Sequence, residues 1–358
     1  MNQTLTLDSF MGNRRAVEIL RRAVERDRLP HALMFAGPEG VGKATLSILL
    51  AQVVNCPAPP IGKACGTCPT CRRIMAVLQA RNLECLNPKG SVRCGSCRNC
   101  KTIAGQHPDV RFIQPDEKVT ISIRQVRAMI DEVSFQPFEA KFRAVILDPA
   151  DQMRPEAMNS LLKTLEEPPS QTIIILVTTS PFLLPVTIRS RARTLQFSGI
   201  PQDQIERYLT EERERTPEEA RIAAAFSNGS LGSALSFNTS HFREARSQAL
   251  RFVSLLLERR SFAEISRLAA AVARDKDDFQ LWVEAVGAVL QDVYYAHVAP
   301  ARIGQHDIID ELTRLAERCP KGAVVSAISG LKRLKAGLTF NLNRQLAVES
   351  LFLSELKS

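Results

Sequence analysis

The sequence predicts an α/β domain built on a mostly parallel sheet, followed by an all-helical region. Three observations lead to this prediction. Apolar strands alternate with amphipathic helices over the first 197 residues, a glycine-rich loop joins the first of these strands to the next helix, and no strand pattern recurs after about residue 197. A chain of 358 residues is long enough for two or three domains.

The predicted elements are read from apolar periodicity, as in the first helix, where Val17, Leu20 and Val24 share one face. Strands are predicted at 32–36, 110–113, 144–147 and 172–177, and helices at 13–28, 44–54, 123–133 and 155–165. Beyond them we expect a small helical unit and then at least four further helices, of which 242–259 and 279–297 show the clearest pattern. The predicted domains are 1–197, with an insertion at 56–103, then 198–241 and 242–358.

Composition and charge favour a soluble globular protein, with 45% hydrophobic and 24% charged residues. The net charge of +9 suits a nucleic-acid or acidic-protein partner without selecting either. No secretory signal is visible in residues 1–11, and apolar runs such as 173–177 are too short to span a bilayer, so we expect a cytoplasmic protein without a membrane partner. Nine cysteines in a reducing compartment indicate metal binding before disulfides.

The glycine-rich loop, Gly37-Pro-Glu-Gly-Val-Gly-Lys43, fits the phosphate-loop consensus through its lysine. Gly37, Gly40 and Gly42 let the backbone bend so that successive amides can face a phosphate. Lys43 adds a positive charge, and the following helix presents its amino-terminal end. The motif predicts a nucleotide-binding fold.

Two residues that an ATPase of this kind needs are missing. Ala44 stands where a serine or threonine hydroxyl would contact magnesium, and Thr45 is rotated about 100° away on the helix. Asp148 ends an apolar strand and could hold magnesium through water, or it could simply cap the next turn. Pro149 replaces the catalytic glutamate, and we expect Asp151 to face elsewhere. The loop is expected to cradle phosphates but to hold magnesium poorly, and whether ATP binds is left open.

The cysteines form two cassettes with the same spacing, C-x8-C-x2-C-x2-C, 29 residues apart. Their members are Cys56, Cys65, Cys68 and Cys71 in the first, and Cys85, Cys94, Cys97 and Cys100 in the second. Four thiolates satisfy a closed tetrahedral structural zinc site, so we predict two zinc ions, or one if the second cassette does not bind its own. An iron–sulfur cluster is the alternative. Cys319 is expected to be a packed or free thiol.

An arginine, Arg191, lies just past the last predicted strand, where it could reach a nucleotide on a neighbouring subunit. Taken alone, an exposed arginine is more simply a solvated surface residue. Its surroundings favour the first interpretation, because several motifs over residues 10–195 together resemble the bacterial clamp-loader AAA+ family. These motifs are Phe10-Met-Gly12, His31, His107-Pro-Asp109, Asn159-Ser-Leu-Leu-Lys-Thr-Leu-Glu-Glu-Pro-Pro169, Leu183-Leu-Pro185 and Ile188-Arg-Ser-Arg191.

Within that family, the residues missing at 44 and 149 resemble the delta-prime class of subunits, whereas the gamma and tau motor subunits keep both. The resemblance implies a pentameric ring of delta, delta-prime and three motor subunits that loads the sliding beta clamp onto primed DNA during replication. It implies that Arg191 is an arginine finger for the adjacent motor subunit, that Thr178 or Thr179 occupies a sensor position, that 198–241 is a lid and that 242–358 is a collar.

The sequence departs from the family pattern in three places. Ala192 replaces the usual cysteine after the finger, Gly232-Ser233 stands where active members often have an arginine, and two cysteine cassettes replace one. Ala44 and Pro149, together with the arginine missing at 232–233, lead us to expect a subunit without its own ATPase activity. The alternatives are an active gamma/tau-like ATPase and a zinc-dependent DNA-binding or repair protein on an AAA+ core. The cassettes lack the interleaving of basic with aromatic residues that the last alternative requires.

Overall fold

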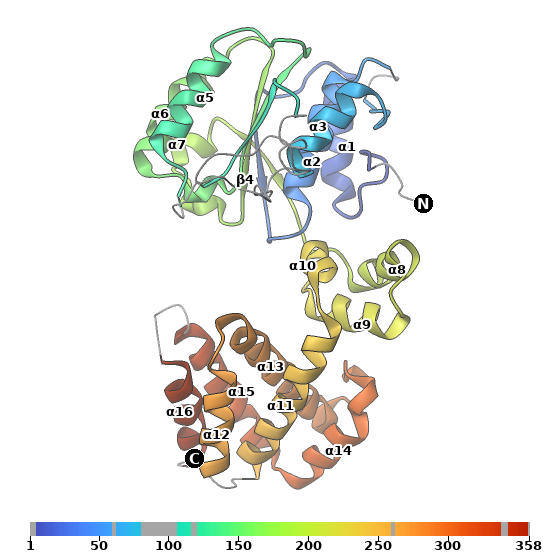
Figure 1. Ribbon diagram of the computed structural model, residues 1–358, viewed down its shortest axis with the longest axis vertical. Coiled ribbons are helices and arrows are strands. Elements are labelled where there is room, and N and C mark those ends of the chain that lie inside the picture. The colour runs from blue at the N-terminus through green and yellow to red at the C-terminus, as the bar shows by residue number, and fades with distance from the viewer. Residues whose placement is uncertain are drawn as a thin grey trace, which may run out of the picture. The chain divides into compact units, whose positions relative to one another are not determined.

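The computed structural model describes residues 5–58, 62–79, 106–115, 120–258, 262–337 and 343–356. The chain divides into two compact units, one of residues 1–214 with 227–235 and one of residues 215–226 with 236–358 (Figure 1). Residues 198–241, the predicted lid, are shared between these units, so the three-domain division stays a prediction. No helix in the described ranges is long and apolar enough to cross a membrane.

The first unit contains a five-stranded sheet in which all neighbouring strands run parallel, as predicted. The strand order is β2-β3-β4-β1-β5. The strands are β1 (Ala32–Ala36), β2 (Val110–Ile113), β3 (Arg143–Leu147), β4 (Thr172–Thr178) and β5 (Arg193–Gln196). The buried strand β1 pairs with β4 on one side and with the edge strand β5 on the other, so the loop that follows it emerges at the sheet's carboxyl edge.

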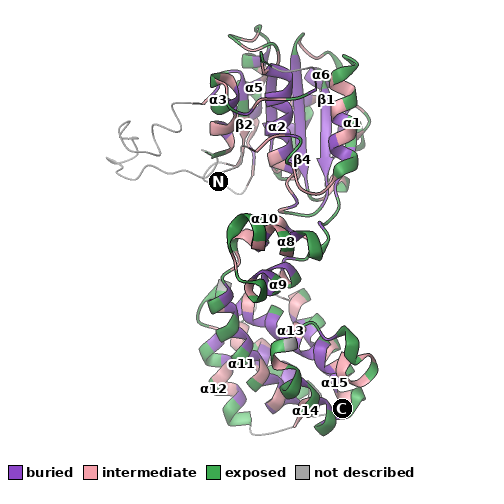
Figure 2. Cartoon of the chain, turned by 90° about the vertical axis from the view of Figure 1, so that its right-hand side faces the viewer, coloured by how far each residue is buried: buried purple, intermediate pink, exposed green. Residues whose placement is uncertain are grey.

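Helices cover both faces of the sheet, because successive strand residues point to opposite sides. In β1, Leu33 and Phe35 belong to the core that α1, α2 and α3 cover, whereas Ala32 and Met34 belong to the core that α5 and α6 cover. The two groups of helices lie on opposite sides of the sheet, whose strands are mostly buried (Figures 1 and 2). The helices of this unit are α1 (Arg14–Glu25), α2 (Lys43–Asn55), α3 (Pro69–Gln79), α5 (Ile123–Val133), α6 (Pro155–Glu166), α7 (Val186–Arg189), α8 (Gln202–Arg213) and α10 (Leu231–Ser236).

Local signals account for where these helices begin. Helix α5 starts with a capping box, in which the Ser122 hydroxyl accepts from the Gln125 amide and the Gln125 side chain accepts from the Ser122 amide. Helix α6 starts at Pro155, a residue suited to the first helical position because its missing N–H would have no helical partner there.

Among the described strands and α-helices, the single-turn helix α7 was not predicted, and neither were β5 and α3. Strand β5 was missed because Leu195 is its only buried residue, so it has no apolar run. Helix α3 was missed because its buried face consists of Cys71, Ile74 and Val77, and the cysteine-rich composition of the insertion obscures this helical spacing. In both cases, pairing with the rest of the fold completes an element whose local pattern is weak.

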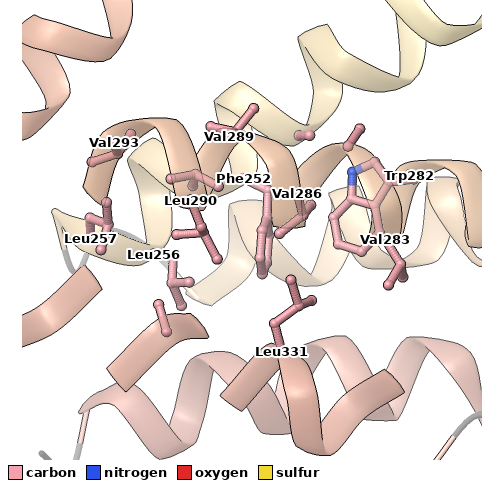
Figure 3. Packing of buried hydrophobic residues seen from close by; sticks show 14 of the residues in the cluster. Phe252, Leu256, Leu257, Trp282, Val283, Val286, Val289, Leu290, Val293 and Leu331 are labelled. Carbon is pink, nitrogen blue, oxygen red and sulfur yellow. The ribbon is translucent and has the colours of Figure 1, made fainter. Parts of the chain in front are cut away.

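The second unit is all-helical, as predicted for the C-terminal region. Its helices are α9 (Pro217–Phe226), α11 (Thr239–Leu257), α12 (Phe262–Val272), α13 (Lys276–Val298), α14 (Ile309–Arg318), α15 (Lys321–Gly337) and α16 (Arg344–Leu356). Helix α13 runs through the core, where Trp282 lies edge-on to Phe252, at 5.0 Å between ring centroids (Figure 3). Trp282 also stacks with Phe279, at 5.8 Å between centroids. This aromatic cluster packs with aliphatic side chains such as Val286 and Leu331.

Candidate functional site

The predicted phosphate loop joins β1 to α2. Gly40 has φ +70° and Gly42 has φ +94°, a backbone region that other residues rarely adopt, so the loop requires glycine at both positions. Gly42 directly precedes α2, whose amino-terminal end therefore lies at the loop. The loop has the placement that its motif predicts, and phosphate binding to it stays a prediction.

The lysine of the loop is bound by the loop itself. Only 6% of the Lys43 surface is exposed, and its ammonium donates to the carbonyl oxygens of Gly37, at 2.6 Å, and Pro38. Burial lowers the pKa of Lys43, although the nearby charge of Asp148 opposes this shift. A phosphate that enters the loop must therefore compete with two carbonyl groups for this ammonium.

Asp151 lies in this site, so the expectation that it faces elsewhere was wrong. Its carboxylate accepts hydrogen bonds from the Thr178 hydroxyl at 2.5 Å and the Thr179 amide at 3.3 Å. Its charge also acts on Lys43. The reason is a tertiary contact, because the short 3-10 helix η1 (Ala150–Gln152) packs against β4, whose last residue is Thr178. Asp151 thus holds the two threonines predicted for the sensor position.

Of the three groups that an ATPase needs around magnesium, the site has the aspartate but lacks the hydroxyl and the glutamate. Asp148 is 8% exposed at the end of β3, and Pro149 follows it. Ala44 offers only a methyl group at the start of α2. Further along α2, the Ser47 hydroxyl donates to the Ala44 carbonyl at 2.6 Å. This hydroxyl is therefore engaged by the helix backbone.

Other segments of the first unit cover the loop. The Gly232 amide donates to the Gly40 carbonyl at 3.0 Å. A Cβ atom on Gly40 would lie 2.0 Å from the Ser230 hydroxyl, and one on Gly42 would lie 2.8 Å from the Phe10 ring. The backbone that a phosphate would approach is therefore in contact with protein on two sides.

Arg191 lies at the surface between α7 and β5. Its NH2 group forms an ion pair with Glu166 at 2.5 Å, and its NH1 group donates to the Thr187 carbonyl at 2.9 Å and contacts the Ser190 hydroxyl at 3.3 Å. About a third of the arginine side chain, 34%, remains exposed. These contacts hold the guanidinium in one place while leaving part of it accessible.

The first cysteine cassette forms a compact cluster. Cys56 ends α2, Cys71 lies in α3, and the other two members lie between them. All four sulfur atoms lie within 4.8 Å of one another, and Cys56 Sγ is 3.5 Å from Cys65 Sγ and 3.9 Å from Cys68 Sγ. Four thiolates bound tetrahedrally to zinc at about 2.3 Å would be about 3.8 Å apart. The cluster therefore fits a structural zinc ion with no open position.

The surroundings of these thiols differ. The Cys68 and Thr67 amides hydrogen-bond to Cys65 and lower its pKa to about 6, whereas burial raises the pKa of Cys68 and Cys71. A bound cation would favour the thiolate form of all four residues. The positive φ of Gly66, +70°, allows the turn that brings Cys65 and Cys68 together.

The remaining cysteines give a mixed result. Cys319 is buried and its thiol donates to the Leu315 carbonyl at 3.0 Å, as expected for a packed thiol. Four predicted ligands lie outside the described residues, namely Cys85, Cys94, Cys97 and Cys100. Zinc binding by this second cassette stays a prediction.

Comparison with known proteins gives the family. The sequence model of the family described as "DNA polymerase III, delta subunit" matches residues 12–80 and 75–201, which together exceed half of the chain. The chain belongs to this family. The predicted resemblance to the delta-prime subunits is confirmed by a DNA polymerase III delta' subunit from Bacillus subtilis, 29% identical over 342 residues that cover 95% of this chain and 94% of that protein.

The chain is also similar to gamma and tau subunits of DNA polymerase III. The tau subunit of DNA polymerase III from Escherichia coli is 26% identical over 375 residues, which cover 98% of this chain and 54% of tau. The chain thus spans about half of tau. A gamma subunit-related protein from Thermotoga maritima is 18% identical, with a TM-score of 0.41 and coverage of 95% of this chain and 98% of that one. A TM-score this low supports no further conclusion.

Sequence reasoning missed the roles of three acidic residues in the first unit. It placed Asp151 outside the site, gave Glu166 no role, and treated Asp109 only as part of a family motif. In the structure Asp109 has no exposed surface and forms a 3.1 Å ion pair with Arg143, the first residue of β3. The sequence did contain a signal for this ion pair, since an acidic residue directly precedes β2 and an arginine begins the neighbouring strand β3.

Proposed function

We propose that this chain is a stator of a DNA polymerase III clamp loader, meaning a subunit that does not hydrolyse ATP and instead serves a neighbouring ATPase subunit. The observation that carries the proposal is the state of the loop. Lys43 is bound by the carbonyls of Gly37 and Pro38, Ala44 offers magnesium no hydroxyl, and Pro149 offers water no base.

Arg191 is the group that the stator would contribute. A guanidinium placed at a neighbour's nucleotide stabilises the charge that develops on the transferring phosphate, and such fingers act in trans in other ATPases and GTPases. Its position after α7, outside the loop of its own chain, and its partly exposed fork support this role. The finger would act on the ATP of the neighbouring subunit, and the chain itself would not hydrolyse ATP.

The partners follow from the family and from the resemblance of the motifs. We infer a hetero-pentameric ring with gamma/tau and delta subunits, cytoplasmic, that loads the sliding beta clamp onto primed DNA during replication. In this ring the helical unit would serve as the collar, and the segment that contacts the Gly40 carbonyl through Gly232 would serve as the lid. DNA would be contacted through the assembled complex.

Zinc would have a structural role. In the first cassette, Cys56 at the end of α2 and Cys71 in α3 would be joined through one ion, with Cys65 and Cys68 completing a closed site. When bound, zinc would fix the insertion to the sheet domain. It would have no role at the phosphate loop. The second cassette would repeat this arrangement.

One observation favours the alternative, an active gamma/tau-like ATPase. The carboxylate of Asp151 lies close enough to Lys43 to act on its charge, and it contacts Thr178, so the site contains an acid despite Pro149. In this reading Asp151 would take the place of the missing glutamate in orienting water.

ATP turnover by the purified chain distinguishes these functions. A stator is expected to show no hydrolysis above that of a Lys43→Ala variant, with or without magnesium. Turnover that disappears in both Lys43→Ala and Asp151→Asn would contradict the stator and establish the alternative. Weak nucleotide binding without turnover agrees with the stator, because the loop amides remain.

Mixing the chain with gamma/tau and delta subunits should give a complex that contains one copy of it.

A further inference from the structure

Glu166 lies at a helix end where an acidic residue is favourable only beside a cation. It is the last residue of α6, where the negative end of the helix dipole faces it, and Glu167 follows directly. An acidic residue there is disfavoured by the dipole unless a cation compensates it. Lys163 lies in the same last turn, and Arg191 is the cation in contact with Glu166, with its NH2 group 2.5 Å from the carboxylate.

Three acceptors on two segments hold the guanidinium of Arg191. The Thr187 carbonyl and the Ser190 hydroxyl, both near the arginine in sequence, receive NH1 at 2.9 and 3.3 Å. Glu166 receives NH2 from a different element, the end of α6. The two local acceptors hold only NH1, so the NH2 end of the guanidinium could still rotate. The contact between NH2 and Glu166 therefore sets the orientation of the guanidinium.

We propose that Glu166 is a positioning residue for Arg191, which it holds in the orientation needed to reach a neighbouring subunit's nucleotide. This inference rests on the proposed finger role of Arg191. Holding a long side chain in advance lowers the conformational entropy lost when the finger engages. The gain appears only in the reaction of the neighbouring site.

General stability does not explain the pair. Glu166 and Arg191 are 49% and 34% exposed, and an ion pair this accessible contributes little to folding. Helix α6 is anchored without it, because Leu161 and Leu165 are buried and the Leu165 carbonyl lies 3.1 Å from His31 Nε2. Glu166→Ala is therefore expected to fold and to assemble normally.

The test uses clamp-loader rings rebuilt with variant chains in the presence of clamp and primed DNA. We define the Arg191-dependent rate as the difference in ATP turnover between wild-type rings and Arg191→Ala rings. Glu166→Ala should lower this rate roughly two- to fivefold, the range that an exposed ion pair can support. Glu166→Gln should retain most of it, because its amide oxygen still accepts from NH2. The matched control is Glu167→Ala, which removes the same charge from the exposed neighbouring residue and should change nothing.

The double variant adds a second readout. Glu166→Ala combined with Arg191→Ala should behave like Arg191→Ala alone, because a residue that acts only through Arg191 has no effect in its absence. An unchanged or increased rate in Glu166→Ala rings, or equal losses in Glu166→Ala and Glu167→Ala rings, would overturn the positioning role while leaving the finger intact. A ring unaffected by Arg191→Ala would instead overturn the proposed function itself.

Discussion

A buried ion pair braces the segment that leads into β3, and its removal gives the sharpest stability prediction. The carboxylate of Asp109 accepts the backbone N–H groups of Phe138 at 2.7 Å, Glu139 at 2.9 Å and Ala140 at 3.0 Å, and it pairs with Arg143 at 3.1 Å. The carboxylate therefore ties the loop between α5 and β3 to the start of β2.

Arg143→Met is the perturbation that exposes the strength of this brace. Arg143 also donates to the Phe135 and Gln136 carbonyls, each at 3.0 Å, and to the Glu132 carbonyl. Methionine fills similar volume but leaves the charge of Asp109 buried without its cation. We expect the free energy of unfolding to fall by about 3–5 kcal/mol, the range for removing one partner of a buried pair.

The effect should depend on pH with a definite sign. Burial raises the pKa of Asp109, but the hydrogen bonds from the Glu139, Phe138 and Ala140 amides and from Arg143 outweigh it and hold the pKa below its ordinary value. A carboxyl whose pKa is lowered on folding stabilises the protein above its unfolded pKa of about 3.9, and this stability is lost as the pH falls through the folded value. The difference between wild type and Arg143→Met should therefore shrink at acidic pH.

Urea unfolding followed by far-UV circular dichroism measures this change. The matched control is Arg111→Met, which removes an exposed ion pair with Glu132 at 2.9 Å and should cost less than about 1 kcal/mol. Trp282, the single tryptophan, lies in the core of the second unit, so its fluorescence reports that unit separately. Similar losses in Arg143→Met and Arg111→Met would refute the reasoning.

The remaining predictions concern the zinc cluster and the phosphate loop. Cys68→Ser should lower the zinc content by one ion per chain in elemental analysis while the sheet stays folded, because the cluster joins α2 and α3 outside the strands; an unchanged zinc content would contradict this site. Native protein should contain two zinc ions, and a single ion would exclude the second site. Gly40→Ala should lower the free energy of unfolding by about 1–2 kcal/mol, because it places a side chain at φ +70° and against the Ser230 hydroxyl. The control is Gly322→Ala, whose Cβ would meet nothing within 4 Å and which should leave the free energy of unfolding nearly unchanged. Equal losses of stability in the two variants would contradict the packing described at the loop.

Sequence reasoning succeeded where the signal is local. Strand β1 and helix α5 were predicted at their observed bounds, because an apolar run after His31 and a helical apolar spacing after Ser122 are each complete within a few residues. The cysteine cluster was also predictable, since four ligands within 16 residues, Cys56 to Cys71, have few other ways to satisfy one ion.

It failed where a residue's role depends on a distant partner. Asp151 was misplaced because its acceptor role depends on the end of β4, 27 residues away at Thr178. Glu166 carries no signal until α7 brings Arg191 beside it. Strand β5 depends on pairing with β1 for its hydrogen bonds. Each of these positions depends on tertiary contacts that periodicity and spacing do not encode.

The central claim is that this chain serves ATP hydrolysis without performing it, and Arg191→Ala in rebuilt clamp-loader rings tests it most directly. The measurement is ATP turnover and clamp loading by rings of verified composition, beside turnover by the isolated chain. The account predicts no turnover by the chain alone, normal assembly of the variant ring, and reduced clamp- and DNA-stimulated turnover. A finger can contribute about 10³-fold or more at its own site, and the total loss is smaller because other sites continue to work. Lysine at this position should restore little, since a point charge does not reproduce the guanidinium fork. Full activity in assembled Arg191→Ala rings would contradict the claim.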